Sequence, residues 1–200
     1  MALEHDIASL VEASEALAST VDNQIESINN TVSSKMTEVN NFVAQQKARV
    51  DSSLDDLTII GDGERGTLSM GIAHFFTSGY GSTNVHLRLP LNVEVDTEMF
   101  HLKVRGYAYH EAKAIDATFV GYAYAHVDNL VQEQATGTHL PTLYVGEDKH
   151  VYCRLSFEKK HYAMFSVDAM RVGSGRLLKA GDIRVIESDE EQVSGDDHAG

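Results

Sequence analysis

The sequence has very little of the residue types that brace small proteins covalently or interrupt helices. Cys153 is the one cysteine among 200 residues, so no disulfide can form within the chain and no cysteine-based metal cluster is available. Only two prolines occur, the first at Pro90, and no glycine precedes Gly61, so nothing interrupts a helix in the first sixty residues. Stability must come from packing or from association between chains, and Cys153 is expected in the core.

Long apolar segments are also missing. No apolar run approaches the ~18 residues that identify a membrane span, so we expect no membrane insertion. The first residues carry Glu4 and Asp6 rather than the basic start and apolar stretch of a secretory signal. We therefore expect synthesis and folding in a cytoplasm.

Basic residues are scarce, and their distribution divides the chain. Sixteen Lys and Arg stand against 30 Asp and Glu, which argues against nucleic acid as a partner because phosphate binding requires clustered bases. Residues 1–57 hold ten acids and three bases, and residues 187–200 hold six acids and no Lys or Arg. The nearly neutral middle therefore marks a separate part of the chain.

Apolar residues near the N-terminus recur at intervals of eleven. Leu10, Val21, Val32, Val43 and Leu54 form one row, and two further rows lie four and seven residues later. Eleven residues over three turns give 3.67 residues per turn, which predicts nearly straight or gently right-handed helices. Ser14 and Lys47 are the polar interruptions. The predicted seam consists of Leu10, Leu17, Val21, Ile25, Ile28, Val32, Met36, Val39, Val43, Val50 and Leu54.

This pattern predicts a parallel coiled-coil stalk over residues 1–57. The alternative is an amphipathic helix packed on its own globular domain, but helices in that role are typically ~10 to 14 residues long. β-Branched Val and Ile occupy successive rows of the seam, a pattern that favours trimers over dimers in heptad coiled coils. We therefore expect a homotrimer.

Beyond the stalk the pattern changes from helical spacing to alternation. Residues 58–66 contain three glycines and are expected to form a hinge. Alternating apolar residues from Asn84 to Val95 predict a half-buried strand, with an edge, a bend or a bulge at Pro90. Further strands are predicted at Phe100–His110, Ile115–His126, Thr142–Val145, His150–Phe157, Tyr162–Val167 and Asp182–Glu187.

Together these segments predict an α+β chain divided by segment. Residues 67–187 are expected to form an all-β antiparallel head, either a sandwich or a barrel-like structure. Residues 188–200 are acidic and nearly without apolar groups, so we expect a disordered tail.

Motifs for catalysis are missing. The chain has no GxSxG elbow, no phosphate-binding loop ending in Lys-Ser/Thr and no HExxH helix. Its histidines lie singly without H-x-H spacing, and no context singles out Asp116 and Asp128 as a glycosidase pair. We expect no enzyme, no metal and no cofactor, and a trimeric sugar-processing enzyme is the distant alternative.

Tyrosines form the main aromatic concentration. Tyr107, Tyr109, Tyr122 and Tyr124 stand in two Gly-Tyr-Ala-Tyr segments that we expect to be neighbours in a sheet. Tyrosine offers amphipathic area suited to a saccharide or a protein epitope, so these four are the candidate receptor contacts. The alternative is cross-strand packing within one head or between the heads of three chains.

The order of stalk, glycine hinge and β head resembles the trimeric fibres of tailed bacteriophages. The segment from about Phe100 to Ile186 is similar to the C-terminal heads of fibre proteins from phages of aquatic bacteria. The segments that carry this similarity are Gly106-Tyr107-Ala108-Tyr109, Ile115-Asp116-Ala117-Thr118-Phe119-Val120-Gly121-Tyr122, Val151-Tyr152-Cys153-Arg154-Leu155 and Met170-Arg171-Val172-Gly173.

The resemblance implies a homotrimeric component of the virion, assembled in the cytoplasm of the bacterial host. It would contact other virion proteins through its N-terminal end. Its head would attach to a glycan or protein on the host cell surface, as in a tail fibre. The alternative is a structural connector or capsid-decorating fibre whose head binds another virion protein.

Overall fold

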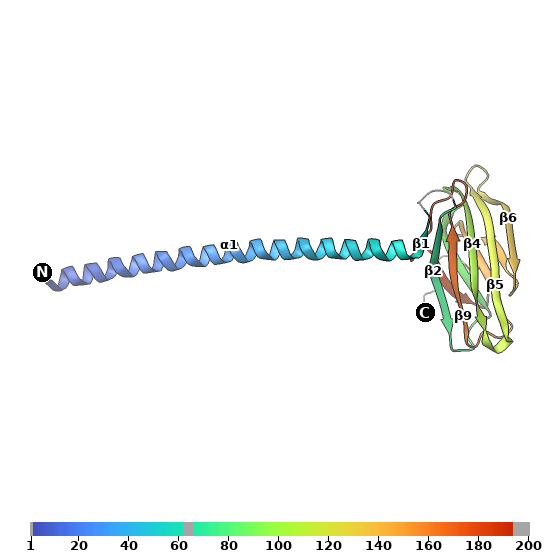
Figure 1. Ribbon diagram of the computed structural model, residues 1–200, viewed down its shortest axis with the longest axis horizontal. Helices are drawn as coiled ribbons and strands as arrows, with labels where there is room; N and C mark the ends of the chain where they lie inside the picture. Colours follow the sequence, from blue (N-terminus) through green and yellow to red (C-terminus); the bar gives the residue numbers. More distant parts are fainter. Residues whose placement is uncertain (1, 62–65, 194–200) are drawn as a thin grey trace. The chain divides into compact units, whose positions relative to one another are not determined.

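A computed structural model describes residues 2–61 and 66–193 of the chain. The chain divides into two compact units between residues 54 and 55, and each is described by itself. The first unit is helical and the second is built from strands (Figure 1).

Helix α1 runs from Ala2 to Thr58, which confirms the helix predicted for the first part of the chain. Its 57 residues correspond to a length of about 85 Å at ~1.5 Å rise per residue. Thr20, Thr31 and Thr37 each donate a hydroxyl hydrogen bond to the carbonyl four residues earlier, so these polar side chains are satisfied on the helix surface. Lys35 and Glu38 add an exposed ion pair at 2.7 Å. The predicted association into a coiled coil remains a prediction.

The second unit contains two antiparallel sheets (Figure 1). One has the order β1-β2-β9-β4-β5-β6 and the other β10-β3-β8-β7. A short 3₁₀ helix, Tyr109–Glu111, joins β4 to β5. The strands are β1 Ile59–Ile60, β2 Leu68–Thr77, β3 Asn84–Asn92, β4 Thr97–Ala108, β5 Lys113–Tyr124, β6 Asn129–Gly137, β7 Thr142–Val145, β8 His150–Ser156, β9 Ala163–Met170 and β10 Arg184–Ser188.

One apolar core lies between the two sheets, so the β-rich head is a sandwich. Leu87 and Leu89 of β3 are fully buried in the same cluster as Leu102 of β4 and Phe119 of β5. Cys153 of β8 belongs to this cluster, as predicted, and burial raises the pKa of its thiol well above its usual value.

The inner row predicted for this strand is confirmed from Val85 to Val93, but the predicted half-burial is wrong at its start, where Asn84 and His86 on the other face are also buried. Leu91 and Val93 are buried like their predecessors, but Val95 is 76% exposed because the chain leaves β3 after Asn92 and turns toward β4. Pro90 lies where the register between β3 and β8 shifts, between Arg88 and Asn92. A ladder irregularity of the kind expected for a bulge is therefore present at this proline, since proline cannot donate to the ladder, whereas β3 lies between β10 and β8 and is not an edge strand.

Three strands were not predicted from the sequence: β2, β6 and the short β1, which lies in the segment 58–66 that was expected to form a hinge and of which residues 62–65 lie outside the described part of the chain. β2 contains a register shift between Ser69 and Ala73, which breaks the alternation that would have identified it. β6 is an edge strand with Gln134 and Thr136 exposed, so its polar composition hides it. Without these strands, the extent of the larger sheet could not be predicted.

The acidic C-terminal segment is ordered further than predicted. After β10, residues 189–193 cross the face of the smaller sheet that points away from the core. Asp189 accepts a hydrogen bond from the Thr83 amide at 2.8 Å, and the Asn84 side chain donates to the Glu190 carbonyl at 2.9 Å. Val193 is 2% exposed. The prediction of disorder from Ser188 is therefore wrong as far as Val193, and residues 194–200 lie outside the described part of the chain.

Removing this segment should destabilise the head. A chain that ends at Glu187 loses the buried Val193 side chain and the hydrogen bonds from Thr83 and Asn84, which together contribute on the order of 3 kcal/mol. Urea unfolding compared with a chain that ends at Val193 measures the difference, because both lack residues 194–200. Identical urea midpoints for the two chains would show that the segment contributes no net stability.

His86 is the polar residue beneath this segment. It is fully buried, and its Nδ1 lies 2.8 Å from the Tyr144 hydroxyl, which accepts a hydrogen bond from the Val193 amide at 3.1 Å. Burial, together with the positive charge of Arg154, lowers the pKa of His86 to about 4. Neutral imidazole is therefore the form that the fold accommodates.

The head should lose stability as the medium becomes acidic, partly through His86. Between pH about 6.5 and about 4, His86 is protonated in the unfolded chain but remains neutral in the folded protein. The free energy of unfolding therefore falls by about 3 kcal/mol over this window. His86→Gln should remove this part of the pH dependence of stability, whereas His126→Gln, at an exposed histidine, should leave it unchanged. Chemical unfolding at several pH values measures it. Parallel pH profiles for wild type and His86→Gln would contradict the assignment.

Candidate functional site

The predicted seam of helix α1 is a stripe of exposed apolar side chains. Its ten members with described side chains range from 44% exposed at Val21 to 72% at Leu10. The side chain of Leu54 lies outside the described residues. Leu3, which the sequence analysis missed, continues the row of Ile25 and Met36 and is also 72% exposed. An apolar stripe of this length is typical of a helix that is covered by other chains.

The four candidate tyrosines separate into two pairs. β4 and β5 are neighbours, as predicted, but they run antiparallel. Tyr107 lies opposite Ala114, whereas Tyr122 lies opposite Met99 at the other end of the hairpin. The Tyr-rich segments therefore cannot form one contact surface.

The pair Tyr122 and Tyr124 is half-buried on the outer face of the larger sheet. Their ring centroids lie 5.0 Å apart, and the ring of His126 lies 5.0 Å from that of Tyr124. These rings pack against one another along one strand and its turn.

The other pair belongs to a larger group of rings, here called the aromatic loop cluster: Tyr80, Tyr107, Tyr109, His110, His161 and Tyr162. Strand register explains why they meet. Thr77 at the end of β2 and Ala108 at the end of β4 both lie opposite Ala163, the first residue of β9. The loops that follow Thr77 and Ala108 and the loop that precedes Ala163 are therefore at the same end of the head.

The rings of this cluster contact one another across the three loops. Tyr80 and His161 stack with centroids 4.4 Å apart and an interplanar angle of 10°. His110 and His161 are perpendicular with centroids 4.9 Å apart, and Tyr109 and Tyr162 are also T-shaped with centroids 6.2 Å apart. The Tyr109 amide also donates to the Tyr162 carbonyl at 3.3 Å.

Despite these contacts the tyrosine rings are largely open to solvent. Tyr80 is 68% exposed and Tyr109 is 60% exposed. Tyr162 is 46% exposed although its backbone has the left-handed φ of 51°, a conformation that bulky residues rarely adopt. Tyr107 and Tyr109 were predicted from the sequence. Tyr80 and Tyr162 were not, because they are isolated aromatic residues in loops far apart in the sequence.

Between the two aromatic ends, the outer face of the larger sheet carries charges in pairs. Arg105 is paired with Asp168, and Lys103 is paired with Asp116. Asp168 also accepts a hydrogen bond from the Gly71 amide at 2.8 Å, at the irregular part of β2.

A shallow apolar depression borders the aromatic loop cluster. Phe75, Phe76, Met164 and Phe165 supply its apolar lining.

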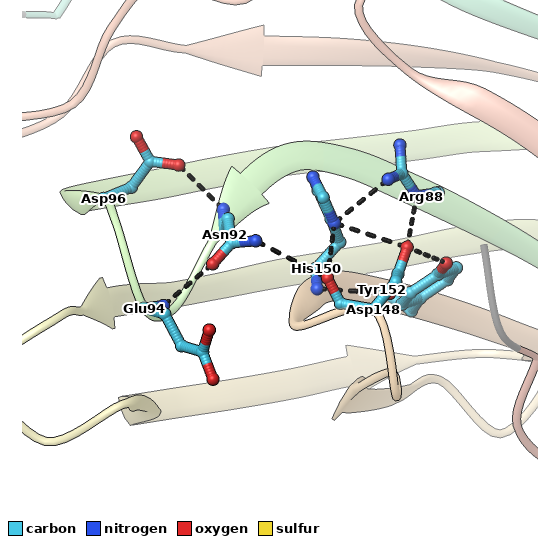
Figure 2. A network of polar contacts seen from close by, with 7 residues as sticks. All are labelled: Arg88, Asn92, Glu94, Asp96, Asp148, His150 and Tyr152. Carbon is cyan, nitrogen blue, oxygen red and sulfur yellow. Dashed lines mark hydrogen bonds and ion pairs between the residues drawn. The ribbon is translucent and has the colours of Figure 1, made fainter.

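A polar network joins the β3–β4 turn to the β7–β8 turn (Figure 2). Asp148 is at its centre and accepts hydrogen bonds from Arg88 Nε at 2.8 Å and from the Tyr152 hydroxyl at 3.0 Å. The Asn92 amide donates to Asp96 at 2.7 Å, and the Glu94 amide donates to Asn92 Oδ1 at 2.9 Å. These contacts are typical of turns fixed by Asx-type hydrogen bonds.

Electrostatics in this network stabilise its charged members. Burial alone would raise the pKa of Asp148, but hydrogen bonds from Arg88, the His150 amide and Tyr152 outweigh burial and lower it. Burial and the bond to Asp148 raise the pKa of Tyr152 to about 12. The carboxylate is satisfied by protein donors, so we interpret the network as a structural clamp on the two turns.

The described residues offer neither a candidate metal site nor a candidate membrane span. Over residues 2–61 and 66–193, no three His, Cys, Asp or Glu side chains gather in a way that could hold a metal ion. The part of the chain that the structure describes contains no helix that is both long and apolar enough to cross a membrane.

Comparison with protein-family models, with curated proteins and with solved structures gave no match to this chain.

Proposed function

We propose that this protein is the subunit of a homotrimeric virion fibre, a bacteriophage tail fibre whose C-terminal head attaches to the host cell surface. The observation that carries the proposal is the seam of helix α1, whose apolar residues recur every eleven positions over most of its 57 residues and remain exposed in the single chain. Such a stripe requires partner helices, and identical chains supply them in register.

The head supports the binding part of this proposal. Its sandwich core is self-contained, whereas the aromatic loop cluster exposes tyrosine rings from three loops at one end. Loops on a rigid sandwich are where binding residues commonly lie, because they vary without disturbing the core. In a trimer the cluster would be present three times on one fibre, which strengthens binding to a surface that repeats its receptor.

Adsorption to bacteria tests the function directly. The purified full-length protein should bind cells of the host strain and reduce adsorption of the parent phage in proportion to its concentration. Labelled protein in a cell-sedimentation assay, with plaque counts as the second measurement, gives both quantities.

The same assay separates the tail fibre from the connector. A connector should bind purified virion proteins and should leave phage adsorption unchanged. Wild-type protein that fails to bind cells to which the parent virion adsorbs would overturn the proposal of host attachment and favour a connector or capsid-decorating fibre.

A further inference from the structure

We infer that the aromatic loop cluster is a saccharide-binding platform, in which Tyr80, Tyr109 and Tyr162 stack against sugar rings while tyrosine hydroxyls and the imidazoles of His110 and His161 bind their hydroxyl groups. This inference rests on the proposed function and deepens it by naming the site and the chemical class of the receptor.

The chemistry of the exposed rings fits a sugar. Every ring in the cluster carries a polar atom: four are phenols and two are imidazoles. A saccharide presents C–H faces framed by hydroxyl groups, so it can use the faces and the polar edges of such rings together. Tyrosine provides this amphipathic area with little conformational freedom to lose on binding.

The loops hold the rings before any ligand arrives. Tyr80 is stacked on His161, and His161 packs perpendicular to the ring of His110. The Lys159 amide donates to Glu111 Oε1 at 3.0 Å, which ties the β8–β9 loop to the 3₁₀ turn that carries Tyr109 and His110. A platform fixed in this way loses little freedom when it binds a weak ligand.

The backbone at Tyr162 points to the same site. A tyrosine with φ of 51° is energetically unfavourable, and the ring that this conformation presents is 46% exposed rather than packed in the core. The ring instead meets Tyr109 edge to face. Strain of this kind persists where the surrounding structure enforces it, and it is concentrated at binding and active sites.

The neighbouring sheet face provides the contrasting chemistry. Phe76 is 61% exposed and Met164 is 48% exposed, and neither side chain carries a hydrogen-bonding group comparable to a phenol or an imidazole. A protein partner would be expected to bury these two residues, since interface cores use such desolvated apolar contacts. The two surfaces can therefore be tested separately.

The test uses the full-length protein on an array of immobilised bacterial surface polysaccharides and oligosaccharides. We expect the wild type to bind a subset of spots and the double variant Tyr80→Ala/Tyr109→Ala to bind them at least about tenfold more weakly. Tyr122→Ala/Tyr124→Ala is the matched control, because it removes two tyrosines from the same sheet at the opposite end, and it should bind like the wild type.

Tyr162→Asn separates binding from folding. Asparagine adopts the left-handed conformation more readily than tyrosine, so this variant should keep or raise its melting temperature while its binding to the array falls. A merely structural role for Tyr162 would instead lower the melting temperature and leave binding by the folded fraction unchanged.

Several results would overturn the inference. They are wild-type protein that binds no spot, binding that survives the Tyr80/Tyr109 change, and binding lost through Phe76→Ser alone. Treating host cells with periodate, which cleaves sugar diols, should abolish adsorption, and protease treatment should not. Adsorption that resists periodate would refute the saccharide receptor but not host attachment. Array binding without adsorption to cells would refute host attachment but not saccharide binding.

Discussion

If the protein is the trimer that we propose, placing aspartate in the seam of helix α1 should convert it into single chains. Val32 and Val43 belong to the same row of the eleven-residue repeat, so Val32→Asp/Val43→Asp brings carboxylates from all three chains into the dry centre of the stalk. Each buried, unpaired charge there costs several kcal/mol in order of magnitude, and their mutual repulsion adds to the loss. Light scattering should give three times the 22.0 kDa chain mass for wild type and a single chain mass for the variant.

The matched control is Asn30→Asp/Asn41→Asp. These two positions are also eleven residues apart and add the same charge, but they lie on the opposite side of the helix from the row of Val32. The control should remain trimeric. A wild-type chain that scatters as a monomer, or a control that dissociates as readily as the seam variant, would refute the predicted seam.

Loss of the trimer should also weaken cell binding far more than any single-site change in the head. In the proposed trimer, three heads on one stalk would engage a repeated receptor together, and such multivalency typically strengthens binding by ~10²- to 10⁴-fold over one site. The Val32→Asp/Val43→Asp variant keeps the head sequence unchanged, so its adsorption to host cells should fall by a factor in this range. Cell-binding titrations with the labelled protein measure the change.

Replacing residues 2–58 with an unrelated trimeric coiled coil should restore adsorption. This replacement separates valence from any direct contact made by the stalk. If it leaves adsorption at the level of the monomeric variant, helix α1 itself contacts the receptor and the assignment of binding to the head is wrong. Adsorption that is equal for trimeric and monomeric protein would show that one head suffices.

Most of the secondary structure could be predicted because its signals are local. The absence of glycine and proline before Gly61, together with the eleven-residue spacing, was enough to predict the helix that the structure has from Ala2 to Thr58. Alternation from Asn84 likewise predicted β3 and its buried face. A period in the sequence is a property of one segment, so it can be recognised without knowing what the segment packs against.

The candidate site could be predicted only in part, because the direction and register in which strands pair decide which aromatic rings lie together. The sequence placed Tyr107 and Tyr109 beside Tyr122 and Tyr124, but antiparallel register separates them to opposite ends of the β4–β5 hairpin. The register of β9 with β2 and β4 brings Tyr80 and Tyr162 from other loops to the end of the head that carries Tyr109. No local pattern encodes which loop ends meet across three strands.

The sequence by itself determined the long helix, its apolar seam, the β-rich head and the buried Cys153, since each depends on composition or spacing within one segment. Tertiary structure alone decided that residues 189–193 pack over His86, that β2 and β6 complete the larger sheet, and that six rings gather at one end of the head. These features depend on contacts between residues far apart in the chain, and such contacts are set by strand order and register rather than by any local preference.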